Sequence, residues 1–157
     1  MSYKIIGKYI KELNFNIPNT KTFYLLSKDI TNYKINIDIK SNRIKQNVIE
    51  VLTSLNLSPI KTNFEVINTK IIFATIIELQ NDKLEKSQLE KIILVEVPSK
   101  IYGDLRKTFV SLFENSGFKD VKISENVDFL NLYKMILHQD KYTLLQYQRS
   151  LLIHRIL

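Results

Sequence analysis

The sequence predicts an α+β fold, because its hydrophobic period changes from that of strands to that of helices about halfway along the chain. In the first half, apolar and β-branched residues alternate with polar ones, as in strands that bury one face. In the second half, apolar residues recur at helical spacing. Successive strands without an intervening helix favour an antiparallel sheet.

Four strands are predicted in the first half. The clearest lies at 33–40, where apolar residues at odd positions alternate with polar residues at even positions, so that one face is buried. The same period recurs at 49–57, and a further apolar, β-branched stretch covers 64–79. A first strand is expected around 9–15 and ends at Pro18-Asn19.

Helices are predicted in the second half, after a charged connection at 81–91. The first follows Pro98, whose missing N–H costs little at a helix start, and it ends at Gly117, a typical C-terminal cap. A short extended piece at 121–123 precedes apolar residues at helical spacing over 127–157. Because no repeat, low-complexity tract or linker interrupts the sequence, we expect a single domain.

Residues that carry chemistry are scarce, which argues against an enzyme. The chain has no cysteine, which excludes disulfides, thiolate zinc sites and a cysteine nucleophile. Its three glycines lie far apart and form no phosphate-binding loop, and His138 and His154 match no metal-ligand pattern. We therefore expect no catalytic residue, no metal site and no cofactor.

Hydropathy predicts a cytoplasmic protein without stable membrane insertion. The N-terminus lacks the continuous apolar run of a signal peptide, and no stretch approaches the roughly 18 apolar residues of a membrane span. Residues 138–157 combine apolar with cationic positions, so they are expected to pack on the domain, on another subunit or on a binding partner. Contact of this segment with a membrane surface remains an alternative.

The net charge is positive but dispersed. It amounts to +7, yet only four of the 23 cationic residues are arginine, the better ligand for phosphate, and the lysines are spread along the chain. This distribution favours a solvated surface and no nucleic-acid partner. A basic nucleic-acid-binding module stays open as an alternative.

Six short segments resemble the SecB family of protein-export chaperones and occur in the order typical of that family. In the first, at 8–19, Tyr9, Phe15 and Pro18-Asn19 stand where the opening strand of SecB typically has tyrosine, phenylalanine and Pro-Asn. The other five segments lie at 71–77, 93–98, 101–106, 117–118 and 127–133. The resemblance covers roughly residues 3–135.

This resemblance implies a fold, a function and an assembly. SecB proteins have a four-stranded antiparallel sheet followed by two or more helices packed on one side. They bind unfolded precursor proteins without ATP, keep them translocation-competent and pass them to the SecA motor. They form homotetramers, as a dimer of dimers with the long first helix at the central interface. The resemblance thus implies one SecB-like chaperone domain over 1–157. Members of the family usually end in a variable tail, whereas the apolar spacing of 138–157 predicts a helical C-terminal extension here.

The resemblance also assigns two sets of apolar positions. The client-binding candidates are Phe15, Phe73, Phe118, Val121, Phe129, Leu132, Tyr133, Ile136 and Leu137. The oligomer-interface candidates are Ile101, Tyr102, Leu105, Arg106, Phe109, Leu112 and Phe113.

The implied SecA contact departs from the family pattern. The family uses acidic residues on the first strand and near the third and fourth strands. Here Glu12 occupies the first acidic place, whereas Asn16 and Lys70 stand where further carboxylates are common, with Asn68 beside Lys70. These four residues are the SecA-binding candidates. Their departures leave open a SecB-like chaperone that serves other clients, such as an antitoxin, without SecA.

Overall fold

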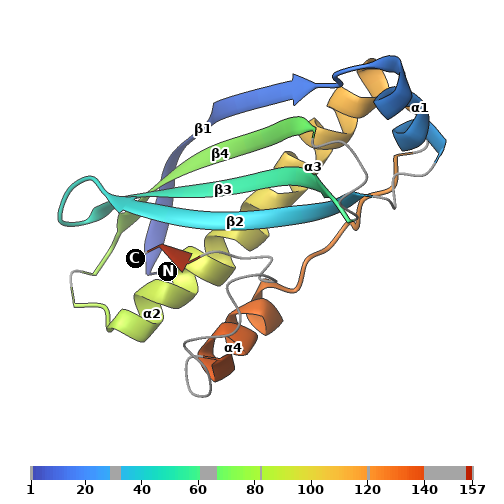
Figure 1. The fold of residues 1–157 in the computed structure, drawn as a ribbon. Helices are drawn as coiled ribbons and strands as arrows, with labels where there is room; N and C mark the ends of the chain where they lie inside the picture. The colour runs from blue at the N-terminus through green and yellow to red at the C-terminus, as the bar shows by residue number, and fades with distance from the viewer. Residues whose placement is uncertain are drawn as a thin grey trace.

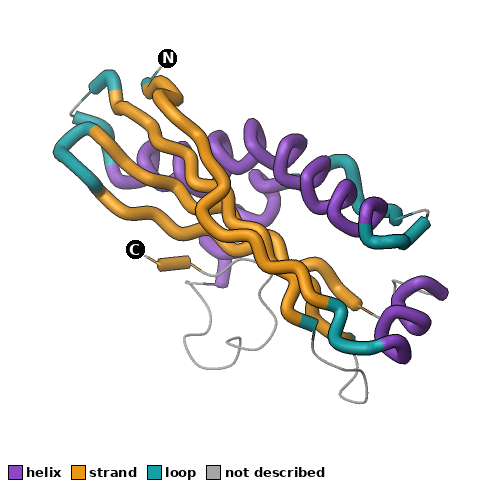
Figure 2. The backbone as a smooth tube through the Cα atoms, turned by 90° about the horizontal axis from the view of Figure 1, so that it is seen from above, coloured by secondary structure: helices purple, strands orange, loops and turns teal. Residues whose placement is uncertain are grey.

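A twisted antiparallel sheet with one long helix along its face forms the body of the molecule (Figure 1). The computed structural model of the chain describes residues 2–28, 33–60, 67–81, 83–119, 121–139 and 155–156. In the described part of the chain, the long helix lies along one face of the sheet and no helix covers the other face (Figure 2). The predicted α+β class is confirmed.

The sheet contains the four predicted strands, in the order β1-β4-β3-β2, with each neighbouring pair antiparallel. A short fifth strand, β5, pairs with β2 in parallel. The bounds are β1 Tyr3–Asn16, β2 Tyr33–Arg43, β3 Val48–Pro59, β4 Asn68–Leu79 and β5 Arg155–Ile156.

Alternation along the strands buries one face, as the sequence predicts. In β2, Tyr33, Ile37 and Ile39 are buried, while Lys34 and Lys40 are exposed. The odd positions of β3 and β4 are buried in the same way against the helices. Removing each large aliphatic side chain from water contributes about 1.5–3 kcal/mol, so this face supplies much of the stability.

The edge strand β1 is irregular. Its pairing with β4 shifts register between Ile5 and Gly7 and again between Ile10 and Glu12, so it contains two bulges. Side chains an odd number of positions apart in a regular strand point to opposite faces. Ile10 and Leu13 are three positions apart, yet both are exposed, because the bulge between them disturbs this alternation.

A short helix, α1 (Thr20–Lys28), follows β1 and was not predicted. Asn19 caps it, because its side-chain oxygen accepts a hydrogen bond from the Thr22 N–H at 2.9 Å. Phe23 then packs against Phe118, with ring centroids 4.7 Å apart. In the sequence, the capping residue Asn19 was the signal that could have predicted this helix.

The long helix begins earlier than predicted, and here the predicted charged connection is wrong. Helix α2 (Lys86–Lys91) continues through a π-helical turn, Ile92–Glu96, into α3 (Val97–Asn115). In the π turn, the Val97 N–H donates to the Ile92 carbonyl, five residues back. This wider turn lies directly before Pro98, which lacks the N–H that an α-helical turn would use there.

Later in the chain, α3 ends at Asn115, and Gly117 follows its C-cap as predicted, with a φ of +98° that favours glycine. Residues 121–124 carry no strand, so the expected extended piece joins no sheet. Helix α4 spans Phe129–Gln139. Most of the expected C-terminal helix lies outside the described residues, and at Arg155–Ile156 the expectation is wrong because they form β5. No described helix is long and apolar enough to cross a membrane.

The core lies between the sheet and α3. Leu105, Phe109 and Phe113 of α3 are fully buried against the sheet. Near the end of α3, Phe113 packs edge-on against Phe15 and Phe118, with ring centroids 5.0 and 5.2 Å away. Such aromatic pairs contribute about 0.5–1.5 kcal/mol beyond their buried area, so they hold the far end of the sheet, α1 and α3 together.

Candidate binding surfaces

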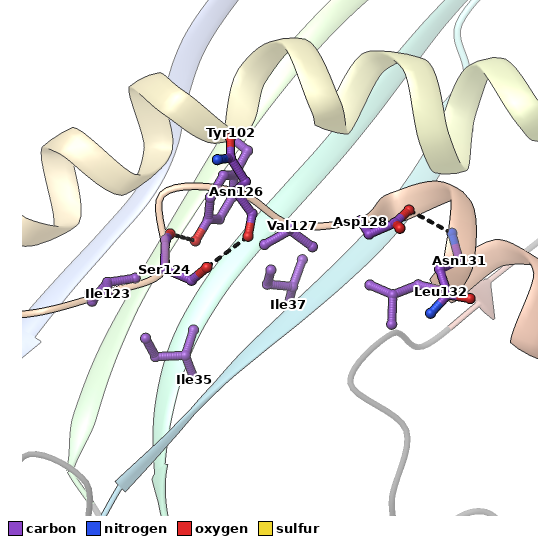
Figure 3. A pocket seen from close by; sticks show the side chains of 10 residues that line it. All are labelled: Ile35, Ile37, Tyr102, Ile123, Ser124, Asn126, Val127, Asp128, Asn131 and Leu132. Atoms are coloured by element: carbon purple, nitrogen blue, oxygen red, sulfur yellow. Dashed lines mark hydrogen bonds between the residues drawn. The ribbon is translucent and has the colours of Figure 1, made fainter.

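An open groove lies where the outer strand β2 faces the chain that leads into α4 (Figure 3). Its volume is about 330 Å³. Apolar side chains from three parts of the chain form its walls, and polar side chains stand at its rim. Its lining consists of Ile35, Ile37, Tyr102, Ile123, Ser124, Asn126, Val127, Asp128, Asn131 and Leu132.

The wall formed by 121–128 is held by hydrogen bonds from α3. Tyr102 Oη donates to the Ser124 carbonyl at 2.7 Å, and Arg106 Nε donates to the Ile123 carbonyl at 2.9 Å. Burial raises the pKa of Tyr102, although the nearby Arg106 partly opposes this, so the phenol stays protonated and remains a donor. An otherwise irregular segment thereby keeps a defined position beside β2.

The first turn of α4 completes the groove. Asp128 caps this helix, because its Oδ1 accepts the Asn131 N–H at 2.8 Å. Phe129 is buried, and its ring lies 6.0 Å from that of Tyr102. Anchored in this way, α4 places Leu132 in the groove wall.

Of the client-binding candidates, only Leu132 lines this groove. Phe15 and Val121 are half-buried, and Leu137 is exposed. The other five are buried in the protomer: Phe73, Phe118, Phe129, Tyr133 and Ile136. The apolar pattern of these candidates thus mostly marks residues that are buried in the core of the protomer.

Several groove residues were missed because they had the pattern of a core. Ile35 and Ile37 belong to the apolar face of β2, and that alternation predicts burial regardless of what covers the strand. Only the strand order places β2 beyond the long strands β3 and β4, beside the groove. Ile123 stood in a predicted extended piece and Val127 at the start of a predicted helix, and neither pattern indicates a groove.

A groove with apolar walls and a polar rim suits an extended apolar chain of variable sequence. The reason is that the hydrophobic effect, unlike a hydrogen bond, requires no particular orientation of the groups that are buried. Among the described residues, no group of three or more His, Cys, Asp and Glu is placed to hold a metal ion.

A second surface is the open face of the sheet, where the four SecA-binding candidates come together. Asn16 is the register partner of Asn68, and Lys70 pairs with Asn14. Lys70 Nζ lies 3.9 Å from Glu12 Oε2, and Asn14 Nδ2 donates to Glu12 Oε1 at 2.7 Å. The single carboxylate of this cluster is therefore paired with a cation.

The same face carries an almost buried carboxylate, Glu50, which is 8% exposed. Tyr9 Oη donates to it at 2.7 Å, Lys11 Nζ lies 3.2 Å away and Asn42 Nδ2 donates at 3.1 Å. The hydrogen bond from Tyr9 lowers the pKa of Glu50, aided by Asn42 and Lys11 and partly opposed by burial. The same bond raises the pKa of Tyr9. The network ties β1 to β3 and β2.

The oligomer-interface candidates mostly face the protomer's own sheet. Five are buried there: Ile101, Tyr102, Leu105, Phe109 and Phe113. Leu112 is half-buried, and Arg106 holds the Ile123 carbonyl. The opposite face of α3 is exposed and contains Gly103, where an added Cβ would meet no atom within 4 Å. A subunit contact along α3 would therefore use this opposite face.

Comparison with known proteins gives a consistent family match. Residues 1–140 match the family described as preprotein translocase subunit SecB. A candidate protein-export protein SecB of Pelagibacter ubique is 38% identical over 133 residues, which cover 85% of this chain and 95% of that protein. The protein-export protein SecB of Anaplasma phagocytophilum is 22% identical over 143 residues, with 83% and 90% covered.

A solved structure has the same fold. The Mycobacterium tuberculosis Rv1957 SecB-like chaperone, in complex with a ChAD peptide from the Rv1956 HigA1 antitoxin, superposes with a TM-score of 0.59. The superposition covers 78% of this chain and 90% of that one, at 9% sequence identity.

Proposed function

Because the chain belongs to the SecB family of protein-export chaperones, which are not enzymes, we propose that it binds unfolded precursor proteins without ATP and keeps them translocation-competent. The groove between β2 and α4 carries this proposal, since it exposes apolar walls that no described segment fills. A protein that binds the unfolded state of a precursor lowers the concentration of free unfolded precursor, and therefore slows its aggregation. The site of this activity is the cytoplasm.

We further propose that the open sheet face delivers clients to the SecA motor. Support comes from the family membership and from the clustering of Glu12, Asn16, Asn68 and Lys70 on neighbouring strands. The charge is unlike that of an acidic docking face, because Lys70 offsets Glu12. SecA binding at this face is therefore expected to be weak and sensitive to salt.

A second candidate function is a SecB-like chaperone that serves other clients, such as an antitoxin, without SecA. The Mycobacterium tuberculosis SecB-like chaperone, solved with an antitoxin peptide, shares this fold. The uncharged Asn16 and the cationic Lys70 at the sheet face favour the same interpretation. A nucleic-acid-binding module has less support, since several lysines already pair with carboxylates, among them Lys8 with Asp104 and Lys11 with Glu50.

The proposed assembly is a homotetramer in which the exposed face of α3, around Gly103, contacts another protomer. Glycine in a helix interior costs about 1 kcal/mol relative to alanine, so its presence at an open surface is accounted for if another chain approaches closely there. Light scattering of the wild type and Gly103→Ala tests this. We expect a tetramer for the wild type and a weakened assembly for the variant.

Suppression of aggregation is the deciding experiment. A denatured precursor is diluted into buffer with and without the chain, and light scattering is followed while the size of the free chain is measured. We expect scattering to fall at a stoichiometric ratio of chain to precursor, without ATP. A monomer that protects nothing would contradict the chaperone proposal. Titration with SecA at low salt then separates the two candidate functions, because only the export chaperone binds saturably.

A further inference from the structure

The chain's own C-terminal strand occupies part of the outer edge of the sheet. In β5, Arg155 and Ile156 pair in parallel with Ile39 and Lys40 of β2 (Figure 1, where β5 is the red arrow). The tube view shows the same short strand beside the outermost long strand (Figure 2). Elsewhere along β2, the described part of the chain places no strand on this outer edge.

This edge borders the groove. Ile35 and Ile37 of β2 line the groove, and Ile37 is two residues from Ile39, the first position that β5 covers. At a rise of about 3.3 Å per residue, that separation is roughly 7 Å. The outer edge of a sheet presents backbone N–H and C=O groups that an extended chain can pair with.

An extended segment that fills the groove would therefore meet β5. If its backbone pairs with β2 from Tyr33 onward and its alternate side chains lie against Ile35 and Ile37, it has room for about five residues before Ile39. A longer segment can continue only where β5 has left the edge.

We propose that β5 and an extended apolar segment of an unfolded client compete for the outer edge of β2. The client adds to the sheet as a strand while its side chains enter the groove, and β5 is the occupant that the chain itself supplies. This inference rests on the proposed chaperone function. It predicts that β5 restricts long client segments and leaves short ones unaffected.

A reversible covalent lock tests the competition. The chain has no cysteine, and Lys40 and Ile156 are Cα partners. Paired strands lie about 4.7–4.9 Å apart, within the Cα separations of about 4.4–6.8 Å that a disulfide spans. Combining Lys40→Cys with Ile156→Cys lets oxidation hold β5 on β2 and reduction release it. The single variants under the same oxidant and reductant serve as controls.

The probes are two fluorescent peptides with apolar residues at alternate positions. One has about eleven residues and can pair along all of β2, whereas the other has about five and ends near Ile37. Fluorescence anisotropy is measured for both peptides with the oxidised and the reduced double variant. We expect oxidation to weaken binding of the long peptide to the level of the short one, and reduction to restore it. The short peptide should bind both forms equally.

A complementary variant releases β5 without a disulfide. Ile156→Pro removes a backbone donor from β5 and disfavours strand pairing, whereas Ile156→Val keeps a β-branched residue there. If β5 occupies the edge for about 70–90% of the time, the long peptide binds Ile156→Pro about 3- to 10-fold more tightly. Ile156→Val should match the wild type.

The outcomes separate this inference from the function on which it rests. Equal binding of the long peptide to the oxidised and reduced forms would overturn the competition while leaving the chaperone function intact. Binding that survives methylation of alternate backbone nitrogens in the peptide would overturn strand addition. Absence of binding by either peptide, together with no suppression of aggregation, would remove the proposed function and the competition with it.

Discussion

At the scale of single residues, the sheet face is organised around one carboxylate. Glu50 is almost buried, and an ionised carboxylate in that position needs donors to replace water. Tyr9, Lys11 and Asn42 supply them from two other strands. The folded state therefore favours the ionised form, so the pKa of Glu50 lies below the ordinary glutamate value of 4.5.

This shift predicts acid sensitivity. The stabilisation from a lowered pKa is complete above the unfolded value of 4.5 and is lost as pH falls through the folded-state pKa of Glu50. Tyr9→Phe removes the largest contribution to that shift, so we expect a lower midpoint of urea unfolding at pH 7 and a smaller loss of stability on acidification. Tyr24→Phe, at an exposed tyrosine of α1, is the matched control and should leave both unchanged.

Two glycines give opposite predictions for the same substitution. Gly117 has a φ of +98°, so Gly117→Ala should lower the free energy of unfolding by about 1 kcal/mol or more through backbone strain. Gly103 lies inside α3, and a Cβ there meets nothing within 4 Å. Gly103→Ala should therefore raise the free energy of unfolding of the protomer by up to about 1 kcal/mol. Urea titration measures both free energies of unfolding, at protein concentrations too low for the proposed tetramer to form. Equal effects of the two substitutions would contradict the different roles given to the two glycines.

At the scale of elements, α4 forms a wall of the groove because α3 and the 121–128 segment position it. Tyr102 and Arg106 hold the segment through its backbone, and the buried Phe129 anchors the first turn of the helix. The groove is thus built on a backbone whose position is defined by hydrogen bonds.

Two leucines of α4 test whether this groove binds clients. Leu132 lines the groove, whereas Leu130 is 40% exposed and does not. Leu132→Asp places a charge in the apolar wall and should weaken client-peptide binding by about 10-fold or more, since burying an unpaired charge is costly. Leu130→Asp should bind like the wild type. Anisotropy titration gives both affinities, and circular dichroism confirms that both variants remain folded. Equal affinities would remove the groove from the client site.

At the scale of the whole molecule, the layered fold keeps the groove and the open face of the sheet apart. One face of the sheet forms the core with α3, and the outer strand borders the groove. The other face stays open and carries the polar cluster of Glu12, Asn16 and Lys70. The surfaces proposed for client binding and for contact with a motor therefore lie apart on one protomer.

The charge of the open face can be reversed without disturbing the core. Lys70→Glu removes a cation at a place where the SecB family commonly has a carboxylate, so we expect SecA binding to become about 3- to 10-fold tighter at low salt and the gain to shrink as salt rises. Lys34→Glu changes the charge by the same amount at an exposed position of β2. If both variants act equally, the effect reflects net charge alone. If neither binds SecA, the alternative chaperone function is favoured.

The sequence alone determined which residues alternate in β2, β3 and β4, where α3 ends, and that the chain resembles SecB, because local period and short motifs carry that information. Only the tertiary structure decided what each apolar face packs against. The pattern of α3 marks Leu105 and Phe109 as buried, yet it does not distinguish the protomer's own sheet from another subunit. Likewise, Ile35 and Ile37 alternate like core residues, and the strand order places them at the groove. The periodicity of the sequence indicates which face of an element is buried. What buries that face depends on contacts between residues distant in the sequence.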